Sequence, residues 1–221
     1  PNIFLKALGY AGGVGAFITF AAAYGIDLDE MAEKGIGSIP DRILAEARRA
    51  WEWAQKSDRT YGLVEDTWVV CDSFKRLWRE AHPNVVAFWR EMEDAARAAI
   101  AYEGTTFDAR GIRFVRHKAW LRMVLPSGRS LCYPSPRVDD NQISYMGTEQ
   151  FSRRWGRLKT YSGKLVENCV QAIARDVLAE NMPTMEMSGY PIVLSIHDEV
   201  ICETPDTDAY TSDSLPGILA I

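Results

Sequence analysis

The pattern of hydrophobic residues changes near Gly104. Before that position, apolar side chains recur every three or four residues, which is typical of amphipathic helices. After it, short stretches of alternating apolar and polar residues are separated by Pro and Gly, which is typical of strands and turns. Helices followed by a small antiparallel sheet predict an α+β fold, and 221 residues suffice for one large domain or two small ones.

The same pattern locates the elements. We expect helices from residue 3 to near Gly25 with a break at Gly12 and Gly13, and then at about 38–55, 67–81, 84–102 and 161–182. Strands are expected at 112–116, 121–125, 131–133, 191–196 and 200–202, with a hairpin near 121–133. The loop rich in Pro and Asp at 134–141 is the expected boundary between a helical region, 1–138, and a second region, 139–221.

Composition excludes several classes of protein. The net charge is −5, the hydrophobic fraction is 47%, and no apolar run approaches the roughly 20 residues that span a bilayer, so neither disorder nor membrane insertion is expected. Four scattered cysteines and three histidines, with no CxxC pair, disfavour a disulfide framework and a structural zinc site. Reduced thiols in the cytoplasm are expected.

The segment His197-Asp198-Glu199 is enclosed by two apolar, β-branched runs and is expected to form a hairpin turn. Adjacent carboxylates repel each other unless they share a cation, so the turn is a candidate site for a divalent metal. The alternative is an ordinary polar hairpin tip. The Trp, Phe and Met stripes of the first half are interpreted as core.

Four ordered stretches together resemble the family A DNA polymerases, the DNA polymerase I type, and most closely their phage-encoded branch. They are residues 7–17 (ALGYAGGVGAF), 125–135 (LPSGRSLCYPS), 159–176 (KTYSGKLVENCVQAIARD) and 194–199 (LSIHDE). The likeness extends from Leu8 to Pro205. It implies helical fingers over 1–138 and part of a palm over 139–221, acting on a DNA primer-template and dNTPs, with a monomer expected.

The resemblance also implies roles for individual residues. Asp198 matches the palm aspartate that helps to hold two Mg²⁺ ions, and Glu199 matches the supporting acid beside it. His197 matches a residue near the primer terminus. Gln171 matches a glutamine that faces the minor groove, where an amide can donate to acceptors common to every base pair.

Tyr10 matches the fingers tyrosine beside the nascent base pair, and Gly12 and Gly13 allow close backbone approach or a bend. The family's triphosphate lysine falls on Asn2, which is a departure. Lys6 lies one turn from Tyr10 and is the remaining candidate for a phosphate contact. The family's other catalytic aspartate would precede residue 1, so we expect a fragment that is inactive alone, from a parent that polymerises DNA in the host cytoplasm.

Two other functions stay open at this point. A metal-dependent phosphodiester hydrolase would use residues 197–199 to hold a metal and activate water, although histidines are few. A DNA-binding remnant would need no chemistry.

The negative net charge hides a basic region. Residues 110–164 contain twelve Lys or Arg and three acids, interleaved with aromatic residues. Lys and Arg bind phosphate backbones with strong salt dependence, so this region is the expected DNA surface. Its principal candidates are Arg153, Arg154, Lys159 and Lys164.

Overall fold

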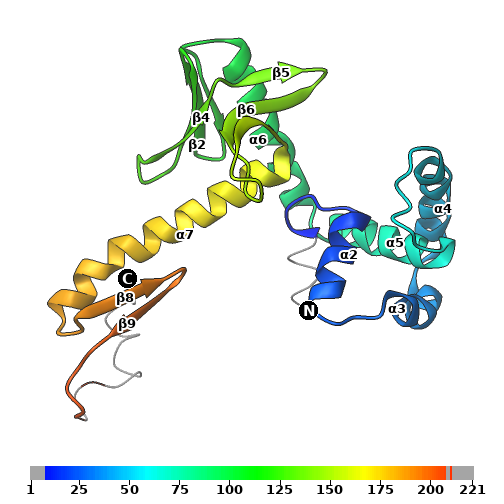
Figure 1. Ribbon diagram of the computed structural model, residues 1–221, viewed down its shortest axis with the longest axis horizontal. Coiled ribbons are helices and arrows are strands. Elements are labelled where there is room, and N and C mark those ends of the chain that lie inside the picture. Colours follow the sequence, from blue (N-terminus) through cyan, green and yellow to red (C-terminus); the bar gives the residue numbers. More distant parts are fainter. Residues whose placement is uncertain (1–7, 208–209, 211–221) are drawn as a thin grey trace.

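The computed structural model describes residues 8–207 and 210. It has three parts: a group of helices, two antiparallel sheets covered by a helix, and a long helix that carries a hairpin at its far end (Figure 1). Helices and small antiparallel sheets confirm the α+β class.

The helical part contains α2 (Val14–Ala23), α3 (Leu28–Gly35), the short 3₁₀ helix η1 (Ile36–Ser38), α4 (Asp41–Lys56) and α5 (Glu65–Ala81), and α6 (Pro83–Ala101) is the helix that covers the first sheet. The break expected at Gly12 and Gly13 is present, because α2 begins immediately after it. Helix α3 was not predicted. It is capped by Asp27, whose carboxylate accepts hydrogen bonds from the backbone N–H groups of Asp29 and Glu30 at 2.9 and 3.1 Å.

The first sheet joins β1 (Thr106–Ala109), β2 (Ile112–His117), β3 (Trp120–Val124) and β4 (Ser130–Pro134) in sequence order, all antiparallel. The hairpin expected near 121–133 is the β3–β4 pair. The second sheet joins β5 (Arg137–Asp139), β6 (Gln142–Thr148) and β7 (Trp155–Thr160). Part of the segment expected as a loop, 134–141, therefore belongs to strands.

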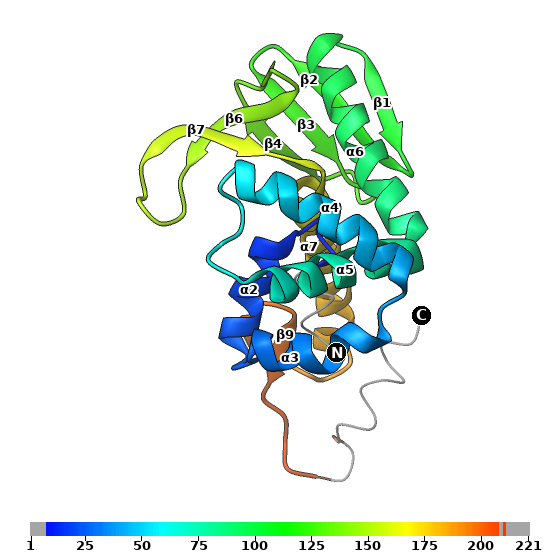
Figure 2. The ribbon, with the colours of Figure 1, turned by 90° about the vertical axis from the view of Figure 1, so that its right-hand side faces the viewer.

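The main core lies where α6 covers one face of the first sheet and meets α7 (Ser162–Met187) (Figure 2). Phe114 of β2, Ile143 of β6 and Leu165 of α7 are buried in this one cluster. The apolar core is thus continuous across residues 138 and 139, and a domain boundary there stays a prediction. A second cluster holds α2, α4 and α5 together.

Helix α7 is 26 residues long and continues past Pro183, where the sequence suggested an end at about residue 182. The third sheet, β8 (Ile192–Ile196) paired with β9 (Glu199–Cys202), lies beside the last turns of α7 (Figure 1). Among the described residues, no helix combines the length and the apolar character that a membrane span requires.

Candidate functional site

The loop of residues 9–13, which carries Tyr10, is held by polar contacts to its backbone. The indole Nε1 of Trp89 donates to the carbonyl of Gly9 at 3.2 Å, and Nη2 of Arg79 donates to the carbonyl of Gly12 at 3.2 Å. The Arg79 guanidinium also lies 5.7 Å from the centre of the Trp89 ring. These contacts from α5 and α6 fix the point from which the Tyr10 side chain starts.

The close backbone approach occurs at Gly163, the second residue of α7. A β-carbon at this position would lie 1.8 Å from the carbonyl oxygen of Tyr10. At Gly13, by contrast, a β-carbon would meet no atom within 4 Å, so the chain itself requires no glycine there. The sequence gives no sign of this role for Gly163, because a tight tertiary contact leaves no local sequence signal.

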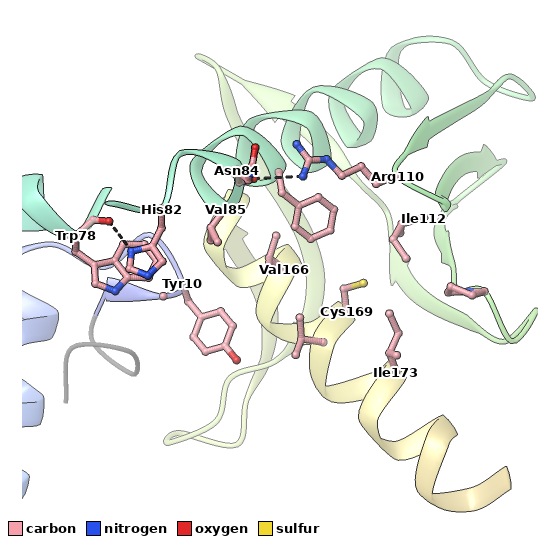
Figure 3. Close-up of a pocket in the computed structure, with 14 residues that line it drawn as sticks. Tyr10, Trp78, His82, Asn84, Val85, Arg110, Ile112, Val166, Cys169 and Ile173 are labelled. Atoms are coloured by element: carbon pink, nitrogen blue, oxygen red, sulfur yellow. Dashed lines mark hydrogen bonds between the residues drawn. The ribbon is translucent and has the colours of Figure 1, made fainter. Parts of the chain in front are cut away.

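The Tyr10 side chain enters an open, mostly apolar cavity of about 560 Å³ between the loop, the start of α6 and α7 (Figure 3). On one side Trp78 stacks between His82 and Trp89, with ring centres 4.3 and 5.8 Å apart. On the other side the cavity is lined by α7 residues, among them Val166, Cys169, Val170 and Ile173.

The turn of residues 125–129 anchors the first sheet to α7. Arg129 donates through Nε to Asp176 at 2.6 Å and through Nη2 to the carbonyl of Ala172 at 2.8 Å. Ser127 donates its hydroxyl to the other carboxylate oxygen of Asp176 at 2.6 Å. The hydrogen bond from Ser127, followed by that from Arg129, lowers the pKa of Asp176. This turn therefore has a structural role that the sequence did not reveal.

Gln171 is exposed on α7 and lines a second cavity, of about 420 Å³. Asn168 and Arg175 line it from the same face of the helix, and Arg129 lines it from the sheet. The Asn168 amide donates to the hydroxyl of Tyr133 at 3.1 Å; burial raises the pKa of that phenol to about 12. Asn168, Arg175 and Arg129 were not predicted as site residues. Asn168 lies three residues before Gln171 and Arg175 lies four residues after it, so both share one helical face with Gln171.

His197 and Asp198 form the two-residue turn between β8 and β9, and Glu199 is the first residue of β9. All three side chains are exposed, and His197 has a left-handed backbone with φ 52°. Arg175 donates to the hydroxyl of Ser195 at 3.0 Å, which ties β8 to the face of α7 that carries Gln171. The hairpin expected from the sequence is present, and its chemical role stays a prediction.

The carboxylates of the turn suit Mg²⁺ only in part. Mg²⁺ is commonly held by one or two carboxylates together with phosphate and water oxygens, and Asp198 with Glu199 supplies such a pair. Within residues 8–207 and 210, however, no three His, Cys, Asp or Glu side chains gather closely enough to hold a metal together. The described residues therefore fit a contribution to a shared ion and do not by themselves fit a two-ion site.

Some basic residues of the region 110–164 form ion pairs and others do not. Arg110, Arg129 and Lys164 pair with Glu91, Asp176 and Glu167. Arg153, Arg154 and Lys159 are exposed and form no ion pair with any described acid. Of the four principal candidates, the three without an ion pair thus lie on the β6–β7 hairpin and on β7.

The candidate residues lie at three successive levels along α7. Its start contacts the Tyr10 loop, its middle presents Gln171, and its last turns carry the hairpin with Asp198. The Tyr10 cavity and the Gln171 cavity share no lining residue, so the structure does not place these two side chains in one pocket. Lys6 and Asn2 lie outside the described residues.

Comparison with known proteins gave two relatives. The chain is 38% identical over 136 residues to a protein named DNA polymerase from Bacillus phage SP02, which covers 59% of this chain and 21% of that protein. It is 28% identical over 158 residues to the cytochrome P450 monooxygenase hasH of Aspergillus fumigatus, which covers 63% of this chain and 26% of the relative. The chain thus spans about a fifth to a quarter of the length of these relatives. No family model and no solved structure matches it.

Proposed function

We propose that this chain forms part of a template-directed DNA polymerase of the family A type, which adds dNTPs to a primer 3′ hydroxyl. The observation that carries the proposal is the 38% identity with the phage DNA polymerase. The order of the four motif stretches supports it, since they span both the helical part and α7 with its hairpin.

Contacts with the DNA are assigned to the exposed polar face of α7. Gln171, Asn168 and Arg175 offer N–H donors along about two helical turns, which suits the acceptors that every base pair presents in the minor groove. Contacts to such common acceptors check the shape of a pair and do not read sequence. The Tyr10 ring, fixed through its backbone, is assigned to the nascent base pair, with Lys6 as the candidate for the triphosphate.

Asp198 is assigned as a Mg²⁺ ligand, with Glu199 in support and His197 near the primer terminus. When bound, Mg²⁺ would stabilise negative charge on the attacking and leaving oxygens of nucleotidyl transfer. The chain's own contribution is positional: the β8–β9 pairing and the Arg175–Ser195 hydrogen bond hold both carboxylates at the end of a hairpin.

Primer extension with Mg²⁺ and dNTPs tests this assignment in the natural gene product that contains this sequence. Asp198→Asn is expected to lower kcat by at least about 100-fold, because one metal-ligating charge is lost at the reacting oxygens. Asp206→Asn, which also removes an exposed carboxylate close to the hairpin, is the matched control and is expected to retain activity. Extension unaffected by Asp198→Asn would overturn the polymerase assignment. Nuclease activity that depends on Asp198 would support a hydrolase instead.

The likeness to the fungal P450 does not provide a second candidate. That relative is 28% identical to the chain, which spans 26% of its length, whereas the phage DNA polymerase is 38% identical.

A further inference from the structure

The β6–β7 hairpin ends in a loop, residues 149–154, that is organised by its own hydrogen bonds. The Glu149 carboxylate accepts from the backbone N–H of Phe151 at 3.1 Å and of Ser152 at 2.5 Å. The hydrogen bonds from Ser152 are the main cause of the lowered pKa of Glu149. The backbone also closes across the loop, between Glu149 and Arg154 at 2.9 Å. The loop therefore has a defined shape before any partner binds.

This loop presents aromatic rings to solvent. Phe151 is 90% exposed and Trp155, where β7 begins, is 63% exposed. Figure 2 shows the hairpin projecting away from the body of the sheets. The fold gains no burial from a ring held in that position, so packing within the chain does not account for it.

The net charge around these rings is positive, with Glu149 as the one acid of the loop 149–154. Arg153 and Arg154 lie in the same loop, and Trp155, Arg157 and Lys159 alternate along β7, so they share one face of the strand. The Arg157 guanidinium already donates a hydrogen bond to the carbonyl of Ser135 at 3.2 Å, so fewer of its N–H groups are available to a partner. A partner that fits both features has flat apolar faces and a regular negative charge, as single-stranded DNA has.

We propose that the β6–β7 hairpin is a binding site for unpaired DNA, in which Phe151 and Trp155 stack on bases while Arg153, Arg154 and Lys159 contact phosphates. Base stacking on aromatic side chains is tolerant of sequence because every base has a flat face. The inference deepens the proposed function: the bound strand would be the unpaired part of the template.

Fluorescence anisotropy with labelled (dT)₂₀ tests the proposal in the natural gene product. Phe151→Ala is expected to weaken binding by about 5- to 150-fold, the range associated with loss of one stacked base, without changing the slope of log K against log salt. The double variant Arg153→Ala/Arg154→Ala is expected to reduce that slope by about 1.4, since each phosphate contact on a single strand contributes about 0.7.

The matched control is Trp53→Ala. Trp53 is 56% exposed on α4 and also lies beside an arginine, with the Arg59 guanidinium 5.2 Å from its ring. It is expected to leave (dT)₂₀ binding unchanged. Far-UV circular dichroism melting checks that each variant is folded, and Phe151→Trp is expected to restore binding because it restores a ring.

Unchanged (dT)₂₀ binding in Phe151→Ala would overturn the proposal, as would equal losses in Phe151→Ala and Trp53→Ala. The proposal would also be overturned, in favour of a membrane contact, if Phe151→Ala lost binding to vesicles of anionic lipid but retained (dT)₂₀ binding. The outcome is separable from that of the proposed function. Phe151-dependent strand binding without Asp198-dependent extension would retain this site and remove the polymerase.

Discussion

The carbonyl oxygen of Tyr10 lies so close to Gly163 that a β-carbon on the glycine would sit 1.8 Å away from it. The contact joins the loop that carries Tyr10 to the first turn of α7, whose later turns carry Gln171 and the hairpin. The helical part therefore packs so closely against α7 that residue 163 has no room for a side chain.

Gly163→Ala tests this contact. The backbone oxygen cannot rotate away as a flexible side chain would, so the loop or the helix must shift, at a cost of about 1–3 kcal/mol. Urea unfolding followed by circular dichroism measures the change. The control is Gly156→Ala on β7, where a β-carbon would meet no atom within 4 Å; it is expected to be neutral or slightly stabilising. Equal stability of the two variants would contradict the close approach.

The sequence predicted the regular parts of this fold well, where the physical signal was local. The expected helices at 67–81 and 84–102 are α5 and α6, because apolar residues at three- and four-residue steps and Pro83 at a helix start are strong signals. The His197–Asp198 turn was expected for the same reason, since apolar runs enclose it.

Strands β5 to β7 were not predicted. In β7, an aromatic and two basic side chains occupy every second position, where a recognisable core strand would have apolar residues. It exposes Trp155, Arg157 and Lys159 and contains Gly156, so its sequence suggests a solvated charged segment. Its partner β6 supplies the burial instead, through Ile143 and Ser144. The anchoring of Arg129 to Asp176 likewise joins residues 47 positions apart, and no local pattern reports such a pair.

Trp89→Phe is expected to loosen the Tyr10 loop. Phenylalanine keeps an aromatic ring against Trp78 but removes the donor to the carbonyl of Gly9, leaving that acceptor unsatisfied. The expected loss of stability is about 0.5–1.5 kcal/mol, the usual contribution of one neutral hydrogen bond. Trp53→Phe, at an exposed position on α4, is the control and should stay within about 0.5 kcal/mol of the original chain. If urea unfolding shows the same small change for both variants, the Trp89 hydrogen bond does not support the loop.

Asp176→Asn is expected to destabilise the chain in a pH-dependent way. The donors Ser127 and Arg129 lower the pKa of the folded carboxyl below its ordinary value of 3.8, so the folded state favours the charged form. This stabilisation is fully present above the ordinary value and is lost as pH falls through the lower folded value. The stability difference between the original chain and the variant should therefore be constant near pH 7 and shrink below about pH 4.

The control for this prediction removes the donors. In a Ser127→Ala/Arg129→Gln background, Asp176→Asn should have little effect at any pH, which a double-mutant cycle of unfolding free energies would measure. A stability difference of the same size in both backgrounds would show that these donors do not set the ionisation of Asp176.

Two substitutions of His197 distinguish a role in shaping the turn from a role in contacting DNA. Its φ of 52° is left-handed, a conformation that Asn tolerates and that strains Ala by about 1–2 kcal/mol. His197→Asn is therefore expected to keep the β8–β9 hairpin intact, as measured by amide hydrogen exchange, while it removes the imidazole. Under the proposed function, the KM for primer-template should rise several-fold in His197→Asn while amide protection of the hairpin is unchanged. In His197→Ala, the KM should rise and the amide protection should also fall. Wild-type KM in the Asn variant would limit His197 to shaping the turn and would leave Asp198 and Glu199 as the hairpin's only candidates for chemistry.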